Sequence, residues 1–257
     1  MNEDSINRFR KKLACGKAVY GPFMKTGDPA FVEAAGYAGM DFVILDREHG
    51  PVSIENMQNN IRAAQLSGLL PVVRCAAITE ESIGKALDIG AAAVEISQIE
   101  TAEEARKAVS MARFYPEGER GVCRFVRAAH YSAQPREDYF KNANQILIIA
   151  QLEGIKAIKN LEEILQVPGI DIIFIGPYDL SQSLGIPGQI DNPIVIDKMK
   201  SIVQAAKNAG IVVGTFTDSP DGLEMWRRIG VQYLSYSVDV GIFYEACCSL
   251  LKKFGKN

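Results

Sequence analysis

The chain has 257 residues, of which 47% are hydrophobic and 23% are charged, so it can bury a sizeable core and is neither disordered nor fibrous. Its formal net charge of -3 gives no overall positive field for phosphates, and we expect no nucleic-acid partner. The five cysteines are odd in number and contain no CxxC pair, which predicts reduced thiols in place of a disulfide framework.

Neither a targeting segment nor a membrane segment stands out in the sequence. The amino-terminal stretch MNEDSINRFRKKL has no apolar run of the kind found in secretory signals. No stretch approaches the roughly 20 apolar residues of a membrane helix. We therefore expect a cytoplasmic protein with no membrane partner.

Short apolar runs rich in β-branched residues alternate with longer amphipathic stretches, which is typical of β-α units around a parallel sheet. In chain order the predicted strands are 17–24, 41–46, 70–74, 92–97, 146–151, 171–175, 211–214 and 233–236. The predicted helices are 29–37, 54–65, 80–89, 102–114, 155–166, 193–208, 221–229 and 240–251. About eight such pairs in this length fit an α/β protein with a single (β/α)8 barrel domain over residues 1–257. A doubly wound open sheet shares the same alternation and is the alternative.

One segment, 115–144, departs from this alternation. It is polar, contains Pro116, Gly118, Gly121 and Pro135, and is long for a connection in a compact barrel. Connections of this length are usually functional loops or interface segments.

Polar residues follow several of the predicted strands at the point where each strand ends. In a barrel these carboxyl ends form one mouth, where the active site lies. The second strand runs into Asp46, Arg47, Glu48 and His49, the third ends on Arg74, the fifth leads to Gln151 and Glu153, and the sixth leads to Asp179. The sequence therefore predicts a base, a cation and carboxylates around one mouth.

Glu153 and Asp179 follow consecutive strands and supply hard oxygen ligands. Such ligands suit Mg²⁺ or Mn²⁺, which leave coordination positions for water or substrate. Alternatively, each acid pairs with a nearby Lys or Arg or caps the helix that follows it.

His49 precedes the turn Gly50-Pro51 and can act as a general base near neutral pH. The alternative is a structural histidine, which is our interpretation of His130. Arg74 closes an apolar strand and needs an anionic partner, either a neighbouring carboxylate or a substrate oxyanion. No lysine ends a predicted strand, which disfavours a Schiff-base aldolase.

The common signatures of nucleotide-binding proteins, zincins and serine hydrolases are absent: the sequence has no GxxxxGK[ST], no GxGxxG after the first strand, no HExxH and no GxSxG.

Several stretches, in order and over nearly the whole chain, resemble the HpcH/HpaI aldolase family. They are AGMDFVILDREHGP, PVVR, ALDIGAA, ETAEEA, YPEGERGV, IIAQLEG, NLEEILQVPGIDIIFIGPYDLSQSLGIPGQ and YLSYSVD. The resemblance implies a (β/α)8 barrel of the phosphoenolpyruvate/pyruvate-binding type whose last helix is exchanged between subunits. It also implies a homo-oligomer, a hexamer built as a trimer of dimers, and Mg²⁺, Mn²⁺ or Co²⁺ as the cofactor.

The same resemblance implies roles for individual residues. It makes His49 the general base, Asp88 the acid that raises its basicity, and Arg74 the transition-state arginine; Asp46 is a second acid that could orient His49. Metal ligation falls on Glu153 and Asp179. Substrate contacts fall on Gln151 and on the turn formed by Gly176, Pro177, Tyr178 and Asp179. The chain departs from the usual family pattern at Ser97-Gln98, Gly154, Tyr178 and the segment 121–132, so the resemblance carries over to the core chemistry and not to the acceptor pocket.

The expected activity is that of a metal-dependent class II aldolase, which forms or cleaves 4-hydroxy-2-oxo acids from pyruvate and an aldehyde through a metal-stabilised enolate. Nothing in the sequence selects the aldehyde. One alternative on the same scaffold is a related lyase or synthase, such as the citrate-forming enzyme of some siderophore pathways. An alternative of another class is a barrel that binds ligands without catalysis.

Overall fold

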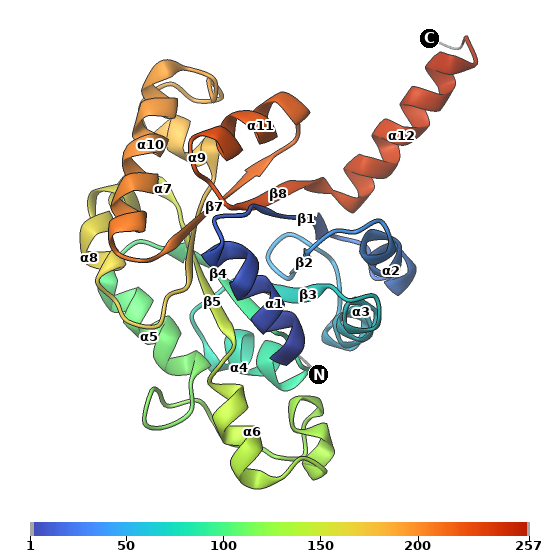
Figure 1. Ribbon diagram of the computed structural model, residues 1–257, viewed down its shortest axis with the longest axis vertical. Coiled ribbons are helices and arrows are strands. Elements are labelled where there is room, and N and C mark those ends of the chain that lie inside the picture. The colour runs from blue at the N-terminus through green and yellow to red at the C-terminus, as the bar shows by residue number, and fades with distance from the viewer. Residues whose placement is uncertain (1–2, 256–257) are drawn as a thin grey trace.

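Eight parallel strands form a closed barrel in the computed structural model, which describes residues 3–255 (Figure 1). The strands are β1 (Val19–Met24), β2 (Phe42–Asp46), β3 (Leu70–Cys75), β4 (Ala93–Ile99), β5 (Leu147–Leu152), β6 (Ile172–Ile175), β7 (Val212–Thr217) and β8 (Tyr233–Val238). Each strand pairs with the next one along the chain, and β8 pairs back with β1. The predicted (β/α)8 barrel is confirmed, and each of its eight strands overlaps a predicted one.

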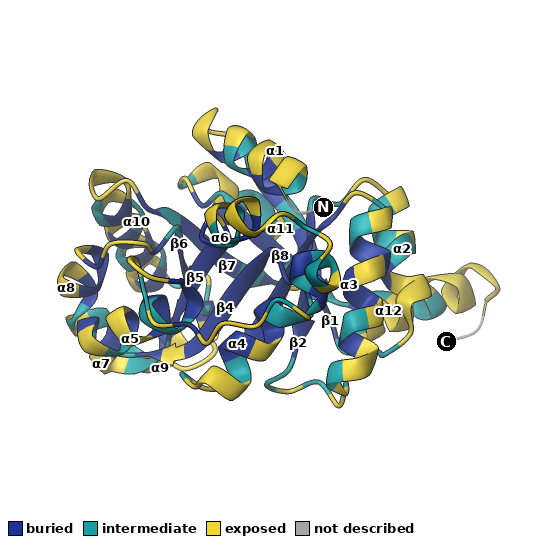
Figure 2. Ribbon diagram, turned by 90° about the horizontal axis from the view of Figure 1, so that it is seen from below, coloured by how far each residue is buried: buried dark blue, intermediate teal, exposed yellow. Residues whose placement is uncertain are grey.

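Helices surround the barrel with their exposed faces outward, while the strands are buried (Figure 2). They are α1 (Glu3–Ala14), α2 (Pro29–Tyr37), α3 (Ile54–Leu66), α4 (Glu80–Asp88), α5 (Ala102–Ala112), α6 (Arg136–Ala143), α7 (Gly154–Lys159), α8 (Leu161–Leu165), α9 (Pro177–Ser183), α10 (Pro193–Asn208), α11 (Pro220–Arg228) and α12 (Asp239–Lys253), with a 3-10 turn η1 (Arg127–Ser132). The predicted helix 155–166 is two helices, because the chain bends at Asn160 between α7 and α8.

Local sequence sets where these helices begin and end. The side chains of Ser53, Thr79 and Thr101 accept hydrogen bonds from the first turns of α3, α4 and α5, as capping residues do. Gly90 follows α4 with a φ of +99°, a conformation that a residue with a side chain rarely adopts. The positive φ at Gly90 ends α4 and lets the chain turn back to the start of β4.

The inside of the barrel is filled by aromatic side chains below its mouth. Phe42 of β2 stacks on Tyr233 of β8 with ring centroids 4.2 Å apart. Phe9 of α1 packs edge-on against both rings, at 6.0 Å and 6.2 Å. The amino-terminal helix, which the sequence analysis did not predict, therefore closes the lower, amino-terminal end of the barrel.

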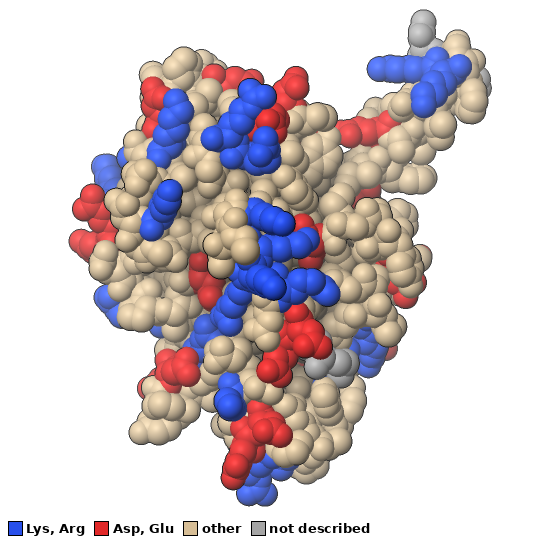
Figure 3. Space-filling model, in the orientation of Figure 1, with Lys and Arg blue, Asp and Glu red and all other residues tan. Residues whose placement is uncertain are grey.

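Basic side chains gather over α1 on the face shown in Figure 3. Two of them are neutralised by acids that precede barrel strands: Arg10 pairs with Asp171 at 3.1 Å, and Lys12 pairs with Asp41. These ion pairs attach α1 to the lower end of the barrel.

The segment 115–144 contains η1 and α6. It joins α5 to the amino-terminal end of β5, so it lies at the end of the barrel opposite the carboxyl ends of the strands.

The last helix, α12, extends away from the barrel (Figure 1). Asp239 is the buried residue among its described residues, whereas Phe243, Tyr244, Leu250 and Leu251 are exposed. No helix in the described part of the chain is both long enough and apolar enough to span a membrane.

Candidate active site

A row of charged residues crosses four consecutive strands. Strand register places Asp46 of β2 beside Arg74 of β3, and Arg74 beside Glu95 of β4. Lys25 directly follows β1, and its Nζ lies 3.3 Å from Oδ2 of Asp46. The row therefore runs Lys25, Asp46, Arg74, Glu95 above the aromatic core.

Asp46 is fully buried and is held by two hydrogen bonds from Arg74. Arg74 Nε donates to Oδ1 at 2.9 Å, and Nη2 donates to Oδ2 at 2.6 Å. Burial alone would raise the pKa of Asp46, but the hydrogen bond and the charge of Arg74 outweigh burial and lower it to about 2. Asp46 is thus a permanent anion that fixes the guanidinium plane.

Asp46 also shapes the turn that carries His49. Its Oδ1 accepts hydrogen bonds from the backbone N–H groups of Glu48 at 3.0 Å and His49 at 3.2 Å. A Cβ on Gly50 would lie 2.3 Å from the carbonyl oxygen of Asp46, so this turn requires glycine.

Glu48 holds Arg74 from a second side. Its Oε2 lies 3.1 Å from Nη1 of Arg74 and accepts a hydrogen bond from Ser97 Oγ at 2.8 Å. Gln98 Nε2 donates to its other oxygen at 3.3 Å. Arg74 therefore has carboxylate partners of its own, and it lies beside the mouth in a fixed orientation.

His49 lies at the rim of the mouth. Its side chain is 65% exposed, and its Nε2 lies 3.9 Å from Oε2 of Glu48. The imidazole is thus open to a substrate, with a carboxylate behind it.

Asp88 does not lie beside His49 within one chain. It ends α4, which returns the chain to the amino-terminal end of β4, and it pairs with Arg120 at 2.7 Å. His49 follows the carboxyl end of β2, so the two side chains occupy opposite ends of the barrel.

Glu153 and Asp179 follow neighbouring strands, β5 and β6, as the sequence analysis predicted. The pKa of Glu153 is raised by burial and by the negative charges of Glu48 and Asp179. Gln151 Nε2 donates to Glu153 Oε1 at 2.5 Å, while the buried Oε1 of Gln151 has no hydrogen-bond partner. Among the described residues, Glu153 and Asp179 form no ion pair within 4.0 Å, whereas Glu48 is paired with Arg74.

The turn after β6 brings Asp179 close to the backbone. A Cβ on Gly176 would lie 2.4 Å from Oδ2 of Asp179, so the carboxylate occupies space that only glycine leaves open. Pro177 is buried, whereas Tyr178 is exposed and its hydroxyl donates to Asp218 at 3.5 Å. Gly176 and Pro177 thus shape the turn, and Tyr178 lies at the edge of the mouth.

Comparison with known proteins places this barrel in a family. The profile of the HpcH/HpaI aldolase/citrate lyase family matches residues 20–246. The chain belongs to this family. It is 34% identical to 2-keto-3-deoxy-L-rhamnonate aldolase of Escherichia coli (strain K12), over 100% of this chain and 97% of the relative.

Solved structures of HpcH/HpaI proteins share the fold closely. One family protein from Burkholderia cenocepacia J2315 has a TM-score of 0.90 and 33% identity, over 97% of this chain and 100% of that chain. The citrate synthase SbnG has a TM-score of 0.84 and 30% identity, over 95% of this chain and 96% of that chain.

The donor set of this HpcH/HpaI protein fits a hard divalent cation. Among residues 3–255, no group of three or more His, Cys, Asp and Glu is arranged to hold a metal ion. Mg²⁺, however, is commonly bound by one or two carboxylates together with substrate and water. Glu153 and Asp179 are such a pair, and the mutual repulsion of the carboxylates is what a bound cation would relieve.

Sequence reasoning missed two charged members of the row. No strand ends on a lysine, as expected, but Lys25 directly follows β1 and reaches Asp46. Glu95 was overlooked inside a predicted strand, although it is the one charged residue in the run AAAVEISQI. Its position in that apolar run was the available signal.

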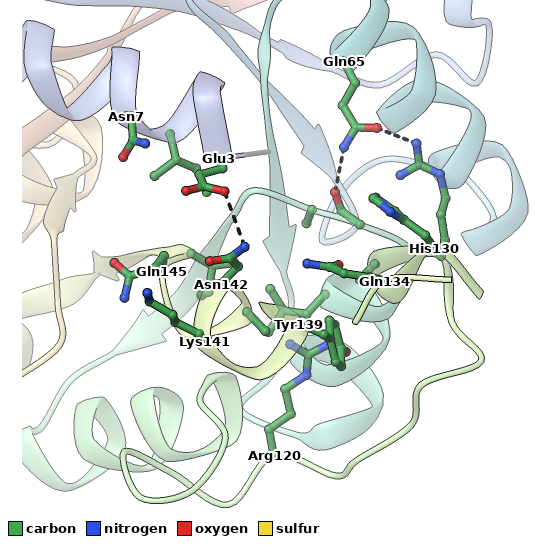
Figure 4. Close-up of a pocket in the computed structure, with 18 residues that line it drawn as sticks. Glu3, Asn7, Gln65, Arg120, His130, Gln134, Tyr139, Lys141, Asn142 and Gln145 are labelled. Carbon is green, nitrogen blue, oxygen red and sulfur yellow. Dashed lines mark hydrogen bonds between the residues drawn. The ribbon is translucent and has the colours of Figure 1, made fainter. Parts of the chain in front are cut away.

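A separate cavity of about 460 Å³ lies at the other end of the barrel (Figure 4). Its lining includes Arg120, which is the partner of Asp88, together with Arg127, His130 and Tyr139 from the segment 115–144. None of the predicted site residues lines it.

Proposed function

We propose that this protein is a class II aldolase that forms or cleaves a carbon–carbon bond next to pyruvate. The observation that carries the proposal is the fixed Arg74, held by Asp46 and Glu48 across the mouth from Glu153 and Asp179. A mouth with one oriented cation and two open carboxylates suits a 2-oxo acid whose oxygens become more negative during the reaction.

A divalent metal ion, Mg²⁺, Mn²⁺ or Co²⁺, held by Glu153 and Asp179 would supply Lewis-acid stabilisation of that negative charge. Arg74 presents a planar guanidinium to the same developing charge. Gln151 has a buried oxygen free to accept a hydrogen bond, and the turn at Gly176, Pro177 and Tyr178 lines the same side of the mouth. These residues orient the 2-oxo acid.

In the cleavage direction, His49 accepts the proton of the substrate's 4-hydroxyl group. The bond between carbons 3 and 4 then breaks, the aldehyde leaves, and the electron pair of that bond becomes the enolate of pyruvate. A proton returns to carbon 3 and gives pyruvate. Condensation follows the same steps in reverse, with His49 returning its proton to the new hydroxyl group.

The aldehyde is a small molecule that meets the edge of the mouth near Tyr178 and Asp218. The similarity to 2-keto-3-deoxy-L-rhamnonate aldolase supports an aldehyde acceptor. The similarity to a citrate synthase supports a second candidate, condensation with an acetyl thioester on the same site.

One experiment separates these functions. The purified protein with Mn²⁺ or Mg²⁺ is incubated with pyruvate and a panel of aldehydes, and in parallel with oxaloacetate and acetyl-CoA. Aldol product from pyruvate supports the aldolase, and citrate formation supports the synthase. A protein with neither activity, and with no metal-dependent decarboxylation of oxaloacetate, is a non-catalytic binding barrel and contradicts the proposal.

We also propose that the protein is a homo-oligomer, a hexamer built as a trimer of dimers, in which α12 packs on another subunit. Phe243, Tyr244, Leu250 and Leu251 of α12 are exposed, and the helix extends away from the barrel in Figure 1, which supports this assembly. In such an assembly Asp88 could act on His49 only from a neighbouring subunit, because the two lie at opposite ends of one barrel.

A further inference from the structure

Glu95 is a buried carboxyl group inside the barrel that the proposed reaction does not use. Its neighbours along β4, Val94 and Ile96, belong to the outer core between the strands and the helices. Side chains alternate along a strand, so Glu95 points into the barrel. It is 0% exposed.

The surroundings of Glu95 leave it incompletely satisfied. Tyr233 of β8 donates a hydrogen bond to its Oε2 at 3.4 Å, and its Oε1 has no hydrogen-bond partner. Among the described residues it forms no ion pair within 4.0 Å, although strand register places Arg74 beside it on β3. On its other side, register places the apolar Ile149 of β5.

Burial favours the protonated form of this carboxyl. Burial, together with the charges of Asp46 and Glu48, raises the pKa of Glu95 to about 8 against the opposing effects of Arg74 and Tyr233. The other titratable neighbour, the Cys75 thiol, stays neutral because burial raises its pKa to about 12. Near neutral pH the row therefore contains a neutral Glu95.

The protonation state of Glu95 decides the charge balance of the row together with its neighbour Glu48. With Glu95 neutral, the cations Lys25 and Arg74 balance the anions Asp46 and Glu48. With Glu95 ionised, three carboxylates surround the same two cations. Arg74 would then attract an anionic substrate less strongly, because a further negative charge lies beside it in a medium of low dielectric constant.

We propose that Glu95 is a positioning residue that keeps the charge of Arg74 available to an anionic substrate, and that its ionisation lowers substrate affinity. The inference rests on the proposed function, since it assumes that the substrate carboxylate or enolate meets Arg74. Glu95 acts through Arg74 and does not itself touch the substrate.

The test is the dependence of kcat and KM on pH, from about pH 6 to pH 10, with the metal ion saturating. In the native protein, KM is expected to rise on the alkaline side near pH 8, while kcat changes less. Glu95→Gln, which copies the neutral carboxyl, should keep KM within about threefold of native at pH 7 and should move the alkaline rise upward by about one pH unit or more. Glu162→Gln, an exposed carboxyl on α8, is the matched control and should follow the native profile.

Tyr233→Phe provides a second and independent variant. The Tyr233 hydroxyl favours the ionised form of Glu95, so its removal should also move the alkaline rise in KM upward. An alkaline rise that stays at the native pH in both Glu95→Gln and Tyr233→Phe would overturn the inference. If the native protein shows no turnover, the proposed function fails. The pH dependence of pyruvate affinity, measured by calorimetry, then tests the role of Glu95 alone. The same pH dependence in the native protein and in Glu95→Gln would overturn that role.

Discussion

Arg74 and Asp46 form a two-point ion pair, with Nε to Oδ1 at 2.9 Å and Nη2 to Oδ2 at 2.6 Å, at adjacent register positions of β3 and β2. The pair fixes the plane of the guanidinium, and the remaining nitrogen, Nη1 of Arg74, faces Glu48. Its geometry depends on a planar fork of donors, which lysine does not have.

Arg74→Lys is therefore expected to keep the charge but to lose about two orders of magnitude or more in kcat/KM for aldol cleavage, since the oriented fork is lost. Steady-state kinetics with saturating metal measure this effect, and thermal unfolding serves as the control for stability. Near-native kcat/KM would make Arg74 a structural partner of Asp46 alone.

Removal of either proposed metal ligand should abolish the response to divalent ions. Glu153→Ala or Asp179→Ala removes one of the two proposed carboxylate ligands, so Mg²⁺ or Mn²⁺ loses a charged oxygen donor and binds more weakly. Mn²⁺ affinity measured by calorimetry should fall in both variants, while circular dichroism stays native. Glu162→Ala on α8 is the control, and native Mn²⁺ affinity in either ligand variant would remove that residue from the site.

His49→Ala should lower aldol turnover by about two to four orders of magnitude, the usual contribution of a positioned base. Metal affinity should change little, since His49 lies at the rim and Glu153 and Asp179 remain. Native rates in His49→Ala would mean that another group accepts the proton.

Asp88→Asn tests whether Asp88 acts on His49 of a neighbouring subunit. If Asp88 of a neighbouring subunit faces His49, its loss disfavours the imidazolium and the acidic limb of the rate profile shifts to lower pH. If Asp88 pairs only with Arg120 of its own chain, the limb stays in place and thermal stability alone decreases.

As the pH rises from about 5 to about 8, the stability of the Glu95→Gln variant should increase relative to that of the native protein. The native state keeps the proton of Glu95 up to a pKa of about 8, whereas the unfolded chain releases it near the ordinary glutamate pKa of 4.5. Native stability is therefore highest below the unfolded pKa and is lost as the pH approaches 8, at most by about 1.4 kcal/mol per pH unit. Urea unfolding at several pH values measures the difference between variant and native protein, and a difference that does not grow with pH contradicts the raised pKa.

The sequence was sufficient to predict the barrel because each strand is a short apolar run bounded by turn residues and polar endings. The same endings placed His49, Arg74, Glu153 and Asp179 at one mouth, since the carboxyl ends of parallel strands meet there. Helix α1 was missed although its buried positions, Ile6, Phe9 and Leu13, have the i, i+3, i+7 spacing of an amphipathic helix.

Other features depend on information that one sequence does not carry. The row of Lys25, Asp46, Arg74 and Glu95 requires the strand register, which places residues from four parts of the chain side by side. The role given to Asp88 came from a resemblance alone, and the return of α4 to the lower end of the barrel separates it from His49 within one chain.

The exposure of helix α12 has a consequence for how this helix folds. A helix of 15 residues is only marginally stable in water on its own, and this one buries little beyond Asp239 against its own barrel. Its order therefore depends on what covers Phe243, Leu250 and Leu251. If a second subunit covers these residues, folding of the last helix is coupled to association, and the helical content of the carboxyl-terminal segment depends on protein concentration.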